Sequence, residues 1–353
     1  MKKQYKTLIV LLLLPMAIMA NGLDLGKYTK QKTIAKAYIV NPDAGIDVKN
    51  SYGNVFVTTW NEDKIELEVL IKVTGDSEDW VSKRLDGIDV DIEALKSMVT
   101  AKTQISKSGS SGSRNSSIEI NYTVKIPKNG TVKINNQYGS IITTDLLSNT
   151  NLNCQYGKLT LGRLGGNSNI IDIDYCSKST IDYVKNATIH ADYSGLTINE
   201  YGKISLNADY TDINFINGTD MKYDCSYGKL VFGKVNTLDG DGDYLSIRVN
   251  EVANQLKINT EYSKINVDKI DSKMNSIAVT SAYTSVSMDY DANSSFDFDV
   301  NVKYANFNYS KDLEINSKQE SGFTKSYQGY YRKSGENKIV IRSQFGSVNL
   351  NKK

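Results

Sequence analysis

The side chains that most often carry enzyme chemistry are scarce in this sequence. The 353 residues include one histidine, His190, and three cysteines, Cys154, Cys176 and Cys225. A single histidine excludes most schemes with histidine as a general base or as one of several metal ligands. Three cysteines are also too few for a disulfide-stabilised scaffold.

The cysteines fall at two different positions of a repeat that is described below. Cys154 and Cys225 occupy the same position four repeats apart, which is too far for a disulfide. Cys176 occupies another position and is expected to face the other way from Cys154. The sequence therefore predicts three small core residues and no disulfide.

Carboxylates are numerous but spread along the chain. Asp174, Asp192 and Asp209 occupy one outward position in three successive repeats, where stacked charges need solvent or a cation. The segment DGDGDY at 239–244 has the spacing of a calcium loop only superficially, because Tyr244 stands where that loop needs glycine. We expect a solvated acidic surface without metal or cofactor, and calcium binding remains the alternative. Polysaccharide cleavage by clustered carboxylates is a more distant alternative.

The segment FTKSYQGYYRKSG at 323–335 combines aromatic and cationic side chains. Such side chains on a loop stack on sugars or other rings and pair with anions. The candidate ligand-binding residues are Phe323, Lys325, Tyr327, Tyr330, Tyr331 and Arg332. The alternative is a long hairpin whose aromatic side chains cover the last repeat.

Tyrosine is unusually frequent, with 23 Tyr against 8 Phe and 2 Trp. Ten of the tyrosines recur at nearly even intervals, and Tyr52 and Phe345 extend the pattern towards the two ends of the chain. The ten are Tyr138, Tyr156, Tyr175, Tyr193, Tyr210, Tyr227, Tyr244, Tyr262, Tyr283 and Tyr304. This periodicity predicts one structural unit per tyrosine.

Each tyrosine has the same surroundings in the sequence. Apolar residues lie four and six positions before it, and three and five positions after it, as Leu256 and Ile258 lie before Tyr262 and Ile265 and Val267 after it. Alternation of this kind predicts two strands, each with one buried face. The apolar positions before the tyrosine are even-numbered relative to it and those after it are odd-numbered. One extra residue must therefore be accommodated at a bend between the two strands. We expect the tyrosine to point inward and the small residue after it to take the unusual backbone conformation.

A unit of this size cannot bury its apolar face alone and must stack on its neighbours. The predicted fold is all-β, a parallel β-solenoid of about ten rungs, with the tyrosines as a structural ladder at its corners. Right-handed winding, and hence a right-handed β-helix, follows from the general preference of parallel crossovers. An antiparallel sandwich would also alternate but would not repeat one corner at a nearly constant interval.

The chain divides into three segments. Residues 1–20 have three lysines ahead of an apolar run and end in alanine, which is typical of a secretory signal peptide; a retained membrane anchor is the alternative. Residues 21–126 form a β-rich cap region that includes a first repeat around Tyr52, and residues 127–353 form the repeat domain, with a loop at about 313–337. Within the cap region we expect strands at 64–73, 97–105 and 117–126, a short helix at 76–85 and a flexible loop at 106–117.

With these patterns, the chain resembles the bacterial putative-adhesin family of β-strand-repeat proteins, a domain of unknown function in envelope proteins of Bacteroidota. The residues that carry the resemblance are VTTWNEDKIELEV (57–69), VKIPKNGTVKINNQYGSI (124–141) and KIVIRSQFGSVNL (338–350). The resemblance implies an exported β-helix with an adhesive or envelope role. It supplies no catalytic residues.

The sequence therefore predicts an exported, non-catalytic protein that acts as a cell-envelope scaffold or an adhesin-like binding module. Its expected partner is a glycan or a cell-surface protein, and its expected place is the periplasm, the outer-membrane surface or the extracellular space. A periplasmic envelope-maintenance or stress-linked protein without an external ligand is the alternative. The near balance of 42 basic and 40 acidic side chains argues against nucleic acid as a partner.

Overall fold

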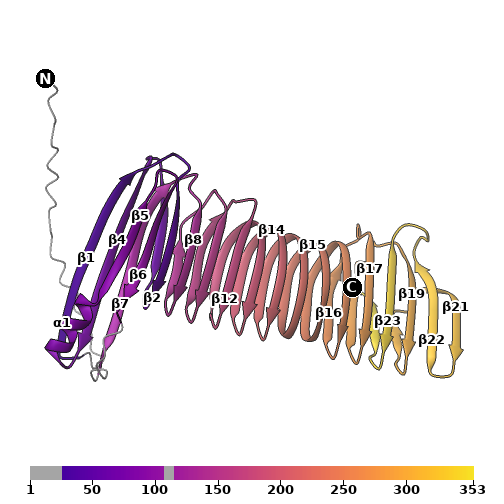
Figure 1. The fold of residues 1–353 in the computed structure, drawn as a ribbon. Coiled ribbons are helices and arrows are strands. Elements are labelled where there is room, and N and C mark those ends of the chain that lie inside the picture. Colours follow the sequence, from indigo (N-terminus) through magenta and orange to yellow (C-terminus); the bar gives the residue numbers. More distant parts are fainter. Residues whose placement is uncertain (1–25, 107–114) are drawn as a thin grey trace.

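The computed structural model describes residues 26–106 and 115–353. The predicted signal peptide, and most of the predicted loop at 106–117, lie outside the described residues. The described chain is almost entirely β-structure, with one sheet of 24 strands and a single helix (Figure 1). The all-β prediction is confirmed. None of the helical structure in these two ranges is long and apolar enough to cross a membrane.

The first part of the chain contains seven strands and the helix. Their bounds are β1 Tyr28–Ile39, β2 Gly45–Ser51, β3 Val55–Trp60, β4 Lys64–Gly75, α1 Glu78–Asp86, β5 Ile88–Ala94, β6 Met98–Ile105 and β7 Ser117–Pro127. The three strands predicted here correspond to β4, β6 and β7. The predicted helix is also present: the Ser77 side chain accepts a hydrogen bond from the Trp80 backbone N–H at 3.4 Å, and the helix buries Val81 and Leu85.

These elements cover the outer edge of the first repeat, which consists of β2 and β3. The strand β6 pairs in parallel with β2, and β5 continues from β6 in antiparallel fashion. On the other strand of the repeat, β7 pairs in parallel with β3, and β4 and β1 follow in antiparallel order. The edge of the repeat is thereby paired, and the sheet ends instead at β5 on one side and β1 on the other.

The following strands form the repeat region. Their bounds are β8 Val132–Gln137, β9 Ser140–Thr143, β10 Thr150–Gln155, β11 Lys158–Leu164, β12 Asn169–Asp174, β13 Ser179–Asp192, β14 Gly195–Asp209, β15 Asp212–Glu261, β16 Lys264–Ile270, β17 Ser276–Ala282, β18 Ser285–Tyr290, β19 Phe296–Lys303 and β20 Phe307–Tyr309. Figure 1 shows them side by side along an elongated body, with the first part of the chain tilted across one end.

Neighbouring repeats pair in parallel, so that equivalent residues lie next to one another. In β10, for example, Leu152 lies opposite Ile134 of β8 and Ile171 of β12. All three side chains are fully buried or nearly so. Burial of each such side chain contributes about 1.5–3 kcal/mol, and the columns of aliphatic residues form the core of the repeat region.

The corner of each repeat corrects one of the predictions. The tyrosine itself, and not the small residue after it, adopts the left-handed backbone conformation, with φ of 51° at Tyr210 and 49° to 65° at its equivalents. In that conformation the side chain points outward together with its predecessor Asp209, while Ala208 and Thr211 on either side are buried. The tyrosines therefore do not point inward as expected. The left-handed backbone at the tyrosine thus accommodates the extra residue between the two strands.

The last part of the chain does not follow the order of the sequence. Its strands are β21 Glu314–Ser321, β22 Thr324–Tyr331, β23 Lys338–Gln344 and β24 Val348–Lys352. The strands β23 and β24 insert between two earlier repeats, because β23 pairs in parallel with both β17 and β19, and β24 with both β18 and β20. The predicted loop at 313–337 is instead mostly an antiparallel hairpin of β21 and β22, and β22 also pairs with β19.

Candidate functional site: the aromatic ladder

The outward corner residues form one continuous stack of aromatic rings. Consecutive ring centroids lie 4.6–5.3 Å apart, and all but three of the consecutive pairs are within 7° of parallel. We call this stack the aromatic ladder; in spatial order it consists of Tyr52, Tyr138, Tyr156, Tyr175, Tyr193, Tyr210, Tyr227, Tyr244, Tyr262, Tyr283, Phe345, Tyr304 and Phe323. The strand spacing of about 4.8 Å sets the ring spacing, so the backbone holds the rings in register.

The ladder presents ring edges rather than ring faces to solvent. Each inner ring is covered on both faces by its neighbours, yet the tyrosines are still 43–51% exposed, through their edges and hydroxyl groups. Partial desolvation, followed by the neighbouring phenol groups, raises the pKa of Tyr193 and of Tyr262 above the ordinary value. The ladder can therefore contact a flat or extended partner along its length, but it cannot accept a flat ring between two of its members.

An acidic column runs beside the ladder, as the sequence predicts. Asp174, Asp192 and Asp209 lie opposite one another in β12, β13 and β14. Neighbouring groups partly compensate their charges: the Gln155 side chain donates to Asp174 at 3.2 Å, and the Asp209 backbone N–H donates to Asp192 at 3.2 Å. No group of three or more His, Cys, Asp or Glu residues in the described ranges is arranged to hold a metal ion.

The segment 239–243 owes its pattern to core packing. It lies within the strand β15, with its aspartates outward and its glycines inward. A Cβ on Gly240 would lie 2.0 Å from the ring of Tyr223, so only glycine leaves room for that buried ring. The side chain of Asn259 donates to Asp241 at 2.9 Å, and the Glu261 backbone N–H donates to Asp243 at 2.7 Å.

The structure separates the six candidate residues of the segment 323–335. Phe323 is 67% exposed and ends the ladder by stacking on Tyr304 at 4.6 Å. Tyr327 and Tyr331 are buried at 6% exposure, where they pack against core aromatics such as Phe307 and Phe296.

The other three candidate residues remain at or near the surface. Lys325 donates to the side chain of Asn306 at 3.3 Å, and Arg332 donates to the backbone oxygen of Ala292 at 3.3 Å. Tyr330 is half-buried on β22. The segment thus forms a hairpin that covers the last repeat with two of its aromatics, the alternative considered from the sequence, and leaves Phe323, Tyr330 and Arg332 within reach of solvent.

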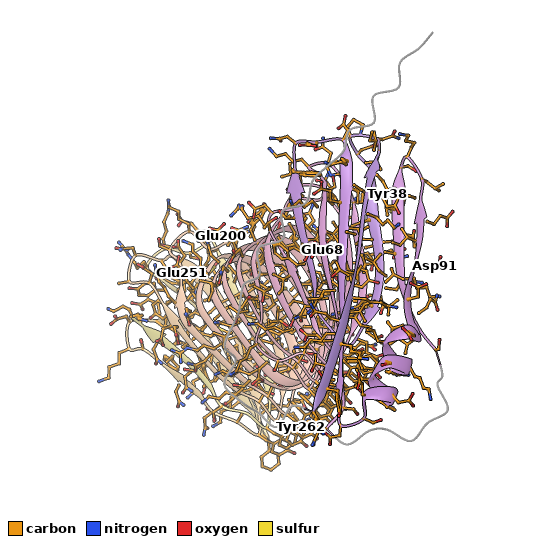
Figure 2. The ribbon with its side chains drawn as sticks, turned by 90° about the vertical axis from the view of Figure 1, so that its left-hand side faces the viewer. Tyr38, Glu68, Asp91, Glu200, Glu251 and Tyr262 are labelled. Carbon is orange, nitrogen blue, oxygen red and sulfur yellow. The ribbon has the colours of Figure 1, made fainter. Side chains whose placement is uncertain are left out.

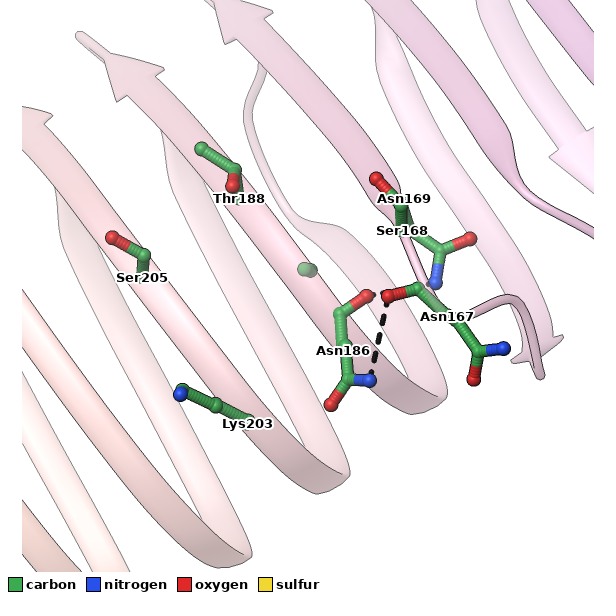
Figure 3. Close-up of a pocket in the computed structure, with 8 residues that line it drawn as sticks. Asn167, Ser168, Asn169, Asn186, Thr188, Lys203 and Ser205 are labelled. Carbon is green, nitrogen blue, oxygen red and sulfur yellow. Dashed lines mark hydrogen bonds between the residues drawn. The ribbon is translucent and has the colours of Figure 1, made fainter.

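A hollow of about 320 Å³ lies on the outer surface of β12, β13 and β14 (Figure 3). Its asparagines mainly close the turns between repeats: Asn169 donates to the backbone oxygens of Gly166 and Asn186 at 2.9 and 2.8 Å, and Asn186 donates to that of Asn167 at 3.4 Å. The amide groups of Asn169 and Asn186 are thus engaged with the backbone and act as structural groups.

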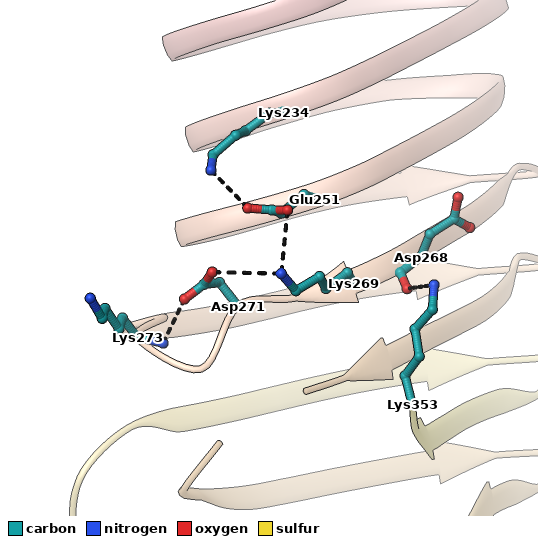
Figure 4. A network of polar contacts seen from close by, with 7 residues as sticks. All are labelled: Lys234, Glu251, Asp268, Lys269, Asp271, Lys273 and Lys353. Atoms are coloured by element: carbon teal, nitrogen blue, oxygen red, sulfur yellow. Dashed lines mark hydrogen bonds and ion pairs between the residues drawn. The ribbon is translucent and has the colours of Figure 1, made fainter. Parts of the chain in front are cut away.

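The edge away from the ladder carries charges of alternating sign. Glu251 accepts hydrogen bonds from Lys234 at 2.9 Å and from Lys269 at 3.4 Å, and Lys269 lies 3.9 Å from Asp271 (Figure 4). The hydrogen bond from Lys234 is the main reason why the pKa of Glu251 lies below its usual value. Figure 2 places Glu251 at one edge of the repeat region and Tyr262 of the ladder at the other. Each of these exposed pairs contributes little stability.

The cysteines correct a second prediction. All three are buried with free thiols, in agreement with small core residues. Cys176, however, does not face away from Cys154: its Sγ lies 3.2 Å from the Cys154 backbone oxygen. The residue directly after the ladder tyrosine is buried in this and the next two repeats, at Cys176, Ser194 and Thr211, a consequence of the left-handed corner that the sequence pattern alone did not reveal.

The sequence also contained an unused sign of the end of the ladder. The spacing from Tyr304 to Phe323, and from Phe323 to Phe345, is close to the repeat length. Phe323 lacks the apolar neighbours of the other corners, and the sequence predicts it as a ligand-binding residue or as part of a covering hairpin. Its place in the ladder depends on the hairpin, which spacing alone does not predict.

Comparison with known proteins finds similarity among solved structures. No family model and no curated protein matches the chain. Matched structures include a putative adhesin from Parabacteroides distasonis (15% identity over 71% of this chain and 92% of that one, TM-score 0.40) and a putative adhesin from Parabacteroides merdae (14%, 71% and 92%, TM-score 0.33). A third is a putative cell adhesion protein from Clostridium sporogenes (13%, 91% and 100%, TM-score 0.17). These neighbours are putative adhesins, the kind of protein that the sequence resembles.

Proposed function

We propose that the mature chain is an exported, non-catalytic binding module of the cell envelope, built as a right-handed parallel β-solenoid of about ten rungs. In this proposal residues 1–20 direct export and are removed, residues 21–126 cap the first rung, and residues 127–353 form the solenoid. The partner is a glycan or a protein of a cell surface.

The single observation that supports binding is the exposure of the aromatic ladder along the repeat region. Soluble monomers rarely leave extended apolar patches uncovered unless these bind a partner. Identical ring edges about 5 Å apart offer the same weak contact many times, and such contacts add up to strong multivalent binding.

Substitution of ladder residues by asparagine tests this function, since asparagine tolerates the left-handed conformation while removing the ring. The variant combines Tyr175→Asn, Tyr193→Asn and Tyr210→Asn. The matched control combines Thr188→Ala and Ser205→Ala, on the strand face beside the ladder. Binding of the purified chains to immobilised mucin and to a glycan panel is measured by surface plasmon resonance.

The proposal expects binding by the native chain and the control, and at least a tenfold loss in the ladder variant. Binding by the ladder variant equal to that of the native chain would show that the ladder is not the binding surface. No binding to any surface by the native chain would favour the alternative, a periplasmic envelope-maintenance protein. Protease added to intact cells distinguishes the two locations, because it degrades a surface protein and spares a periplasmic one.

The exposed residues of the hairpin are proposed as further contact points of the same module. Phe323 lies at the hairpin turn and can engage a ligand at the ladder end, whereas Tyr330 and Arg332 lie at the opposite end of β22 and can engage a ligand there. Tyr327 and Tyr331 belong to the core. Tyr330→Ser should lower binding with little change in melting temperature, and Tyr331→Ser should lower the melting temperature. A large loss of stability in Tyr330→Ser would assign that residue to the cap.

A further inference from the structure

Two buried thiols meet at one place in the repeat region. Cys154 lies two residues before the ladder residue Tyr156, and Cys176 lies directly after Tyr175 in the next repeat. Both positions point into the core, and Cys176 Sγ lies 3.2 Å from the backbone oxygen of Cys154. Each thiol is the main influence on the pKa of the other: the interaction lowers the pKa of Cys176 and raises that of Cys154.

This contact is a regular feature of the repeat. In the following repeats, the residue after the tyrosine touches the same position of the preceding repeat: Ser194 Oγ lies 3.5 Å from the backbone oxygen of Ile173, and Thr211 Oγ1 lies 2.9 Å from that of Ala191. At these three corners the fold thus places the side chain after the tyrosine against the backbone of the residue that lies two positions before the tyrosine of the preceding repeat. Cysteine occupies both of these positions only at Cys154 and Cys176.

The third cysteine provides an internal comparison. Cys225 takes the same position in its repeat as Cys154, two residues before Tyr227. The residue that faces this position from the next repeat is Leu245, directly after Tyr244. Cys225 is buried, and burial raises the pKa of its thiol to about 12. Its repeat position therefore brings it no thiol partner.

We propose that Cys154 and Cys176 form a disulfide that ties neighbouring repeats together at the ladder corner. Each thiol gives up one proton and one electron as the S–S bond forms. A small-molecule disulfide such as oxidised glutathione takes up both electrons and both protons and becomes two thiols. The bond forms during folding, before stacking closes the core. Export, as proposed above, would supply an oxidising compartment, but the disulfide does not depend on that function.

Refolding of the full chain in a mixture of reduced and oxidised glutathione tests the proposal, with circular dichroism to verify the fold. The refolded protein is denatured, and its thiols are alkylated before and after reduction and located by peptide mass spectrometry. We expect Cys225 to be alkylated before reduction, and Cys154 and Cys176 only after it, with their two peptides linked. Three free thiols, or a link that includes Cys225, would overturn the proposal.

Two variants provide matched controls. Cys225→Ala should keep the linked peptides, whereas Cys176→Ser should leave Cys154 free. Serine is suited to position 176, because Ser194 occupies the equivalent position in the next repeat, where its hydroxyl donates to the Asp192 backbone oxygen at 2.7 Å. The melting temperature of native and Cys225→Ala protein should rise on oxidation, and that of Cys176→Ser should not. A rise in Cys176→Ser would also contradict the proposal.

Discussion

The ladder residue Tyr210 allows stacking and backbone strain to be separated by experiment. Its ring stacks on Tyr193 at 5.0 Å and on Tyr227 at 4.7 Å, while its backbone has a φ of 51°. An aromatic pair contributes about 0.5–1.5 kcal/mol, so loss of both pairs costs about 1–3 kcal/mol. The left-handed conformation costs a residue with a Cβ about 1–2 kcal/mol, and glycine adopts it freely.

Two substitutions of this residue should therefore differ in a definite direction. Tyr210→Ala loses both stacks and keeps the strain. Tyr210→Gly loses both stacks but relieves the strain, at the cost of about 0.4–1 kcal/mol of extra freedom in the unfolded chain. We expect the glycine variant to be less destabilised than the alanine variant by about 0.5–1 kcal/mol.

The position in the ladder should matter as well. Tyr52, at the end of the ladder, stacks on the single ring of Tyr138, so Tyr52→Ala should lose about half as much stacking energy as Tyr210→Ala. Urea unfolding followed by circular dichroism gives the free energies. An alanine variant as stable as the glycine variant at 210 would refute the strain argument. Equal losses at 52 and 210 would refute the pairwise stacking argument.

Three further predictions concern the corners, the inserted strands and the core. Gly139→Ala should destabilise the fold by about 1–3 kcal/mol in urea unfolding, because a Cβ there would lie 1.8 Å from the Gly53 backbone oxygen, whereas Gly165→Ala, with no atom nearer than 3.5 Å, should be tolerated. Deletion of 338–353 removes β23 and β24, the strands that join β17 and β18 to the repeat beyond them, so limited proteolysis should cut within 291–337 in the deletion variant and spare it in the full chain. Burial raises the pKa of Tyr122 to about 12, above its unfolded value of about 10, so the stability from its neutral form should be complete below pH 10 and be lost as the pH rises to 12. Measured by urea unfolding, the free energy of unfolding should fall less across this pH range in Tyr122→Phe than in the native chain. An equal fall in both would show that Tyr122 does not cause the pH dependence.

Much of the architecture could be predicted because it depends on local periodicity. Alternation with period two forces one face of each strand inward, and the recurrence of the tyrosine at a nearly constant interval forces equivalent residues to stack. The helix at Glu78–Asp86 could be predicted because its cap residue and apolar positions lie within a single short segment. The tyrosine-centred repeat is interrupted between the copy around Tyr52 and Val132, which likewise indicated that other strands separate the first repeat from the second.

The direction of the corner side chain could not be predicted from periodicity. A parity change requires one extra residue, but alternation alone does not say which residue absorbs it. The left-handed conformation at Tyr175 turns that side chain outward and Cys176 inward. As a result the ladder is an exposed surface, and Cys176 is in contact with Cys154.

The sequence by itself determined the all-β composition, the repeat length and the identity of the ladder tyrosines, because all of these follow from spacing along the chain. Only the tertiary structure decided that the ladder faces solvent, that two cysteines meet, and that β23 and β24 lie between earlier repeats. The physical reason is that these features depend on which backbones become neighbours in space. Hydrogen bonding between strands selects those neighbours. A strand at the end of the chain can pair with the unpaired edge of a strand that lies many residues earlier in the sequence.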